Sequence, residues 1–334
     1  MGSADSATNR TDDGSLATLE CSPASRSDSA RDLGPVWVFP GLGCRFVGMG
    51  ADLFGKSPVA DAIFSQAQEI LGYDLREVCL EGSGRKIVPA KQEAQVIYTV
   101  SCGYAAALRS MNRRLGATAG HSLGNWAAAW AAGAYDFPTG LRFVTQVEDL
   151  LEELVAPESQ TMGVVIGLEE STVKSLIAEH TDLWLANWNS PGQYIVGGDA
   201  KSVDALLSAA TGLQAKRSKR LPTDRALHTP LMQAVSERLR EVLDSEEWSE
   251  PSIPLISSAD SRVLRSSAEV REFFGSFLDQ PVRWDATIRS LCENSVADYV
   301  EVGPGNVLGS MFPFIDNTAD VRSASELLEQ DVAP

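Results

Sequence analysis

Short apolar runs alternate with longer amphipathic stretches along most of the chain. The run Val36–Phe39 is apolar, rich in β-branched and aromatic residues, and ends at a Pro-Gly pair, which predicts a buried strand. Helical patterns follow over residues 57–71 and 94–111, then a short strand at about Ala117–Gly120 and a helix that opens at Ser122. Because strands that alternate with helices are typical of a mostly parallel sheet, this pattern predicts an α/β fold.

Residues 155–223 follow a different pattern. Apolar strand segments, two short helices and a turn at Asn-Ser-Pro-Gly succeed one another in the order β-α-β-β-α-β, the order of a ferredoxin-like unit. We therefore expect a large α/β-hydrolase-like domain with a parallel sheet, an inserted ferredoxin-like small subdomain, and a cleft between them. The expected boundaries are 34–154 and 224–320 for the large domain, 155–223 for the subdomain, 1–33 for a polar, disordered tail and 321–334 for a C-terminal tail.

Composition narrows the class of protein. The 334 residues are 44% apolar and carry a formal net charge of −17, which argues against a general nucleic-acid-binding protein because such proteins need a basic face. No window approaches the roughly 18 apolar residues of a membrane-spanning helix, and the first residues lack the basic-then-apolar order that is expected of a secretory signal. We expect a cytoplasmic protein without a membrane partner. The five cysteines form no CxxC pair, so no metal site is expected.

The segment "AGHSLG" places a serine where a predicted strand turns into a predicted helix. G-x-S-x-G is the nucleophile-elbow pattern, in which Gly120 and Gly124 leave room for a tight turn that exposes Ser122 at the helix N-terminus. Free N–H groups and the helix dipole can stabilise an oxyanion there. A serine that merely caps the helix fits the same pattern. The pentapeptide alone leaves both interpretations open.

A catalytic serine needs a base, and the chain has three histidines. His121 is adjacent to Ser122 and is expected to point away from the hydroxyl group. His180 ends a polar helix, where a solvated histidine is common. His228 lies where the chain leaves the inserted unit, so it is the expected base.

The chain resembles the malonyl-CoA:acyl-carrier-protein transacylase family, the acyltransferases of fatty-acid and polyketide synthesis, and in particular its discrete, trans-acting polyketide synthase members. The resemblance extends from Val36 to about Phe314. It is carried, in the family's order and spacing, by "FPGLG" with "VGMG", Gln95, "GHSLG", "NWNSPGQYIVGG", "HTPLM", "QPVRW" and "EVGPGNVL".

The resemblance implies a role for each matching residue. Ser122 would carry the acyl group as an ester in a ping-pong reaction, with His228 as its general base. A backbone carbonyl near Phe277, instead of a carboxylate, would orient the histidine. The backbone N–H groups of Leu42 and Leu123 would form the oxyanion hole; family members usually have Gln at position 42, but a main-chain donor survives that change.

Departures from the family pattern bear on the acyl group. Malonyl-transferring members hold the substrate carboxylate with an arginine at the position of Val147, so we expect an acyl group without a free carboxylate, such as an aminoacyl or peptidyl starter. Arg225 could replace that arginine, hold a phosphate of coenzyme A or pantetheine, or be solvated. Malonyl transfer therefore stays an alternative, as does hydrolysis of acyl-carrier thioesters. The expected acyl pocket contains Val147, Asn125, Trp126, Asn187, Asn189, Arg225 and Leu227; Asn187 and Asn189 also fit plain turn residues.

The expected partners are an acyl thioester and an acyl carrier protein. The thioester is carried by the phosphopantetheine of coenzyme A or of a carrier, and no permanently bound cofactor is expected. Because carrier proteins are acidic and this chain is acidic too, docking needs a local basic patch. The densest basic cluster is expected beside the cleft, although it also fits a protected sheet edge; it comprises Lys216, Arg217, Lys219 and Arg220. We expect a monomer.

Overall fold

Six strands form the larger of two sheets in a computed structural model, which describes residues 34–80 and 89–330. The strand order is β10-β9-β1-β2-β7-β8; the first five strands are parallel and β8 runs antiparallel to β7. The bounds are β1 Val36–Phe39, β2 Ala117–Gly120, β7 Leu255–Ile256, β8 Val263–Leu264, β9 Asp298–Glu301 and β10 Asp320–Ser323. The expected disordered tail over residues 1–33 lies outside the described residues.

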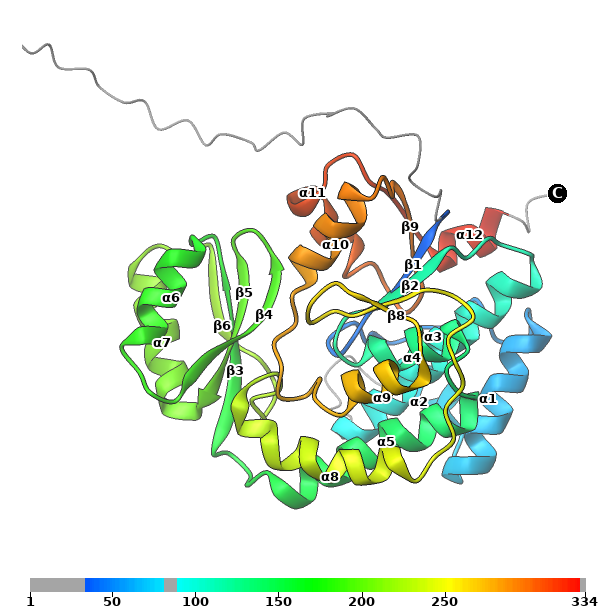
Figure 1. The fold of residues 1–334 in the computed structure, drawn as a ribbon, viewed down its shortest axis with the longest axis horizontal. Helices are drawn as coiled ribbons and strands as arrows, with labels where there is room; N and C mark the ends of the chain where they lie inside the picture. Colours follow the sequence, from blue (N-terminus) through cyan, green and yellow to red (C-terminus); the bar gives the residue numbers. More distant parts are fainter. Residues whose placement is uncertain (1–33, 81–88, 331–334) are drawn as a thin grey trace, which may run out of the picture. The chain divides into compact units, whose positions relative to one another are not determined.

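Helices cover both faces of this sheet (Figure 1). Successive side chains of a strand point to opposite faces, so Val36 and Val38 join an apolar cluster with α10 (Trp284–Glu293). Trp37 and Phe39 pack with α3 (Ala90–Ser110) and α4 (Gly124–Ala132) on the other face. None of the described helices is long and apolar enough to cross a membrane. Their bounds are α1 Pro58–Leu71, α2 Leu75–Leu80, α3 Ala90–Ser110, α4 Gly124–Ala132, α5 Phe137–Leu154, α8 Gln233–Asp244, α9 Ser267–Phe274, α10 Trp284–Glu293, α11 Phe312–Ile315 and α12 Ala324–Gln330, with 3₁₀ turns at Pro230–Met232 and Gly309–Met311.

The smaller sheet has four antiparallel strands in the order β4-β5-β3-β6. Two helices cover one of its faces, where Val173 and Leu206 pack on Val165 and Val196 (Figure 1). The elements follow along the chain as β3 Gln160–Ile166, α6 Glu170–Ala178, β4 Leu183–Ser190, β5 Gln193–Asp199, α7 Ala200–Gly212 and β6 Arg217–Arg220.

The outer edge of β4 is joined to the segment that precedes α10. The Trp188 N–H donates to the Val282 carbonyl at 2.9 Å, and the Val282 N–H donates to the Ala186 carbonyl at 2.9 Å. These bonds satisfy the edge of β4 with backbone from the other part of the chain. Strand β6 ends the small sheet on its opposite side.

The expected C-terminal tail is wrong for residues 321–330. Strand β10 pairs in parallel with β9 at the edge of the large sheet, and α12 follows it directly. Ala324 and Leu327, three residues apart on one helix face, are buried in the main core. The Ser325 hydroxyl donates to the Asp52 carboxylate at 2.6 Å. Strand pairing, two buried side chains and a hydrogen bond therefore hold a segment whose composition is mostly polar.

Candidate functional site

Ser122 lies at the turn between β2 and α4. Its φ of 54° is in the left-handed region, which costs a residue with a side chain about 1 kcal/mol or more. A Cβ on Gly120 would lie 2.2 Å from the Asn125 nitrogen, and one on Gly124 would lie 2.0 Å from the Phe39 oxygen. Only glycine fits these two positions, so the close approach of β1, β2 and α4 fixes the serine at the helix start.

The side chain of His228 meets this serine. Ser122 Oγ and His228 Nε2 are 2.7 Å apart. On the other side of the ring, Nδ1 is 2.9 Å from the Phe277 carbonyl and 3.2 Å from the Gln280 carbonyl. Since carbonyl oxygens only accept, the proton belongs on Nδ1, and Nε2 is left to accept the proton of the serine. The resemblance points to the Phe277 carbonyl; the second carbonyl, of Gln280, was not anticipated.

Burial keeps His228 neutral. The ring is almost completely removed from solvent, and this burial lowers the pKa of His228 to about 4, with a smaller contribution from nearby His121. The two carbonyl contacts act in the opposite direction but do not outweigh burial. At neutral pH the imidazole is therefore free to take a proton from Ser122.

His121 points to the small sheet. Its Nε2 lies 2.9 Å from the Asn189 Oδ1 on β4, and its ring meets Trp284 edge-on at 5.6 Å between ring centroids. Burial lowers the pKa of His121, so it too is neutral. Asn189 thus holds the residue before the nucleophile, and its expected place in the acyl pocket stays a prediction. Asn187 is also buried, and its Oδ1 has no hydrogen-bond partner in the described residues.

Two backbone N–H groups lie beside the serine. The loop after β1 packs directly on the elbow, since a Cβ on Gly41 would lie 3.3 Å from both the Leu123 nitrogen and the Ser122 Cβ. Within residues 34–80 and 89–330, the N–H groups of Leu42 and Leu123 donate no hydrogen bond. Unpaired donors at this position can stabilise the negative oxygen of a tetrahedral intermediate.

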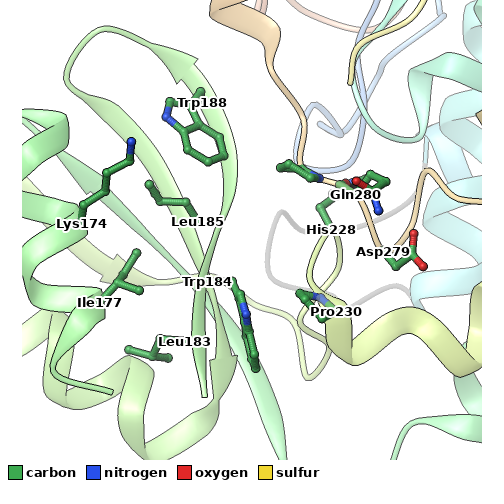
Figure 2. A pocket seen from close by; sticks show the side chains of 11 residues that line it. Lys174, Ile177, Leu183, Trp184, Leu185, Trp188, His228, Pro230, Asp279 and Gln280 are labelled. Atoms are coloured by element: carbon green, nitrogen blue, oxygen red, sulfur yellow. Dashed lines mark hydrogen bonds between the residues drawn. The ribbon is translucent and has the colours of Figure 1, made fainter. Parts of the chain in front are cut away.

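A cavity of about 410 Å³ opens next to His228. Figure 2 shows Trp184 and Leu185 of β4 on one side of it, and Pro230 and Gln280 with His228 on the other. The walls are mostly apolar, with Lys174 and Asp279 as the charged groups. Such a cavity suits the slender arm of a thioester. In the part of the chain that the structure describes, no group of three or more His, Cys, Asp or Glu could hold a metal ion.

Three of the expected acyl-pocket residues, Val147, Leu227 and Arg225, are buried, and Arg225 forms an ion pair that the sequence did not predict. Val147 and Leu227 both belong to the main apolar cluster. Arg225 is neither solvated nor free, because its Nη1 lies 2.5 Å from the Glu148 Oε2 and the two side chains are 10% and 5% exposed. The expectation that Arg225 is solvated is therefore wrong, whereas binding of a substrate carboxylate or of a phosphate by Arg225 stays a prediction.

Asn125 and Trp126 do not fit the acyl-pocket prediction. The Asn125 amide donates to the Ser122 carbonyl at 2.9 Å and to the Ser258 hydroxyl at 3.0 Å, and the residue is fully buried. Trp126 stacks on Phe274 at 3.9 Å between ring centroids. Nearly every residue of α4 is buried, so side chains that follow the elbow support it from within the core.

The basic cluster does not lie next to the cavity. Its residues are exposed on or beside β6, the strand at the sheet edge opposite β4, whereas the cavity lies against β4. Arg220 also has local partners, since its Nε donates to Thr161 Oγ1 at 2.9 Å and its Nη1 lies 3.5 Å from Asp204 Oδ2. The cluster comprises Lys216, Arg217, Lys219 and Arg220, and its expected position beside the cleft is wrong.

Solved structures share this fold. A malonyl-transacylase in complex with its type II polyketide synthase acyl carrier protein matches with a TM-score of 0.83 and 28% identity, covering 89% of this chain and 99% of that one. The malonyl CoA-acyl carrier protein transacylase of Coxiella burnetii matches with a TM-score of 0.84 and 28% identity, covering 89% and 96%. The α/β fold with its parallel sheet is thus the acyltransferase fold.

Sequence comparison gives the family. The model of the acyl transferase domain family matches residues 36–314. The malonyl CoA-acyl carrier protein transacylase of Bacillus subtilis is 30% identical over 294 residues, which cover 87% of this chain and 93% of the relative. The chain belongs to the acyl transferase domain family and is an acyltransferase.

Proposed function

We propose that the protein moves an acyl group from a thioester to the phosphopantetheine thiol of an acyl carrier protein, through an ester on Ser122. The 2.7 Å contact between Ser122 Oγ and His228 Nε2, in a chain of this family, carries the proposal. A carrier protein as acceptor is supported by the similar transacylase structure in complex with its acyl carrier protein. No permanently bound cofactor is needed. The cytoplasmic location and monomeric state remain predictions.

The reaction follows from the proton positions at the dyad. Ser122 Oγ attacks the thioester carbonyl carbon while its proton passes to His228 Nε2, and the N–H groups of Leu42 and Leu123 bind the oxyanion. The carbon–sulfur bond then breaks, and the imidazolium returns the proton to the leaving thiolate. In the second half, the carrier thiol gives its proton to His228 and attacks the ester carbon, and the serine oxygen leaves with that proton.

The comparisons support malonyl as the acyl group. The relatives from Bacillus subtilis, Escherichia coli and Synechocystis are all named malonyl CoA-acyl carrier protein transacylase. On this basis malonyl transfer from coenzyme A to a carrier protein is the first candidate reaction. The names of these relatives do not identify a residue of this chain that would bind the malonyl carboxylate.

A second candidate is transfer of an acyl group without a free carboxylate, such as an aminoacyl or peptidyl starter in polyketide synthesis. It is favoured by Val147, an uncharged residue at the position where the family resemblance places an arginine. It is also favoured by Arg225, whose guanidinium is already paired with Glu148. A buried carboxylate without a cation of its own is strongly destabilised.

The experiment is acyl loading followed by intact mass measurement of enzyme and carrier. The protein is incubated with malonyl-CoA or acetyl-CoA and then with a holo acyl carrier protein, using Ser122→Ala as the matched control. We expect an acyl adduct on the wild type, none on Ser122→Ala, and transfer of the acyl mass to the carrier. An adduct that survives in Ser122→Ala would overturn the choice of nucleophile, and release of free acid without carrier loading would indicate a hydrolase.

A further inference from the structure

Glu148 and Arg225 form a buried ion pair between two distant segments. Glu148 lies on α5, and Arg225 lies three residues before His228, 77 positions further along the chain. The guanidinium has a second carboxylate nearby, since Arg225 Nε is 3.6 Å from Asp224 Oδ1, but that side chain is 55% exposed. Glu148 is therefore the partner that matches the charge of Arg225 inside the protein.

The burial of an ion pair is by itself weak evidence for a role in stability. Burial raises the pKa of Glu148, and the nearby Arg225 guanidinium acts in the opposite direction. Buried ion pairs can often be replaced by apolar side chains of similar size without loss of stability. A role in stability alone therefore does not account for two charges at this place.

The position of the pair connects it to the acyl-transfer site. Val147 precedes Glu148, Leu227 comes two residues after Arg225, and both are in the apolar cluster. The same cluster contains Leu123, which follows the nucleophile, and Phe277, whose carbonyl holds His228. The two charges therefore lie, along the chain, directly after Val147, the position where the family resemblance places the carboxylate-binding arginine, and three residues before the catalytic histidine.

We propose that Glu148 acts as a built-in carboxylate that occupies Arg225 and so excludes acyl groups with a free carboxylate. A malonyl carboxylate that entered would meet a guanidinium already neutralised and a second negative charge beside it. Without Glu148, the planar guanidinium would be free to bind a carboxylate from the substrate through two hydrogen bonds. Glu148 is on this view a specificity-determining residue; the inference rests on the proposed acyl transfer and on its second candidate acyl group.

The first test is the ratio of malonyl to acetyl loading on Ser122, with malonyl-CoA and acetyl-CoA as probes and intact mass as readout. We expect acetyl to be preferred by the wild type, and Glu148→Ala to raise the malonyl-to-acetyl ratio about tenfold or more. The double variant Glu148→Ala/Arg225→Met should return the ratio to the wild-type value. Asp149→Asn removes the neighbouring, half-exposed carboxylate and should leave the ratio unchanged. Equal loading of both groups by the wild type, or an unchanged ratio in folded Glu148→Ala, would overturn the inference.

The second test does not depend on catalysis. Malonate, with neutral malonamide as its matched control, is added during thermal unfolding. We expect malonate to raise the melting temperature of Glu148→Ala but not of the wild type or the double variant. If Glu148→Ala does not fold, Glu148→Gln, which keeps the side-chain volume, takes its place. Absence of the malonate effect in a folded single variant overturns the inference, whereas absence of any acyl-enzyme overturns the proposed function alone.

Discussion

The two sheets contribute to the site in different ways. The large parallel sheet fixes the backbone conformation at the nucleophile. Ser122 follows β2 in a left-handed conformation, and Gly124 packs against the backbone of β1. The small antiparallel sheet supplies side chains, with Asn189 holding His121 and Trp184 lining the cavity. Its far edge, β6, carries exposed charge.

The two parts of the site should therefore differ in which amino-acid substitutions they tolerate. A backbone position without room for one more carbon cannot adjust unless the strands that enclose it move. A side chain on the wall of a cavity can change while its neighbours stay in place. Changes around the elbow should therefore abolish activity, whereas changes in the small sheet should alter affinity or specificity.

The largest effect is expected from adding one methyl group at the elbow. The Cβ of Gly124→Ala would lie 2.0 Å from the Phe39 oxygen, so we expect a loss of about 3 kcal/mol in the free energy of unfolding, and no acyl-enzyme. Gly212→Ala is the matched change in the small-sheet unit, where a Cβ meets nothing within 4 Å; it should be neutral or stabilise by about 0.5 kcal/mol. Urea unfolding measures both. Equal stabilities of the two variants would contradict the comparison.

The pH dependence of acylation should show that burial lowers the pKa of His228. The base acts only when neutral, and burial lowers its pKa to about 4, so the single-turnover rate should stay level from pH 7.5 to about 5 and then fall. An unperturbed histidine, with a pKa of about 6.5, would already have lost half of the rate at pH 6.5. His228→Ala should slow acylation by about 10² to 10⁴ at all these pH values. Circular dichroism at each pH checks that the protein is folded, and a midpoint near 6.5 would refute the buried base.

Local sequence patterns predicted the elements around the nucleophile well. The strands over 36–39 and 117–120 have the predicted bounds, because a short apolar run closed by glycine or proline leaves little freedom in where a strand ends. The motifs also paired Ser122 with His228, and the structure brings the two side chains together. The Gln280 carbonyl was missed, although "QPVRW" begins at that residue and marked the loop.

What the sequence did not predict depends on contacts between distant segments. The partner of Arg225 is 77 residues away on a different element, and no spacing rule relates the two positions. Asn125 and Trp126 were expected in the pocket because they follow the serine, but their environment is decided by the helices that surround α4. The place of β6 was wrong because strand order in a sheet does not follow chain order.

The smallest effect is expected at the far edge of the small sheet. If Lys216 and Arg217 attract an acidic carrier, replacing both with glutamate should raise the KM for the carrier about two- to fivefold at low salt and leave kcat unchanged. The effect is small because exposed ion pairs contribute little binding energy and salt screens them. Reversal of Lys56 and Lys201, which are also exposed, changes the net charge equally and serves as the control. An equal rise in both variants would mean that the effect comes from the total charge of the protein and that β6 is not the docking site. The carrier would then have to dock nearer the cavity, where Lys174, which lies 2.7 Å from Glu170, is the cation among the lining residues (Figure 2).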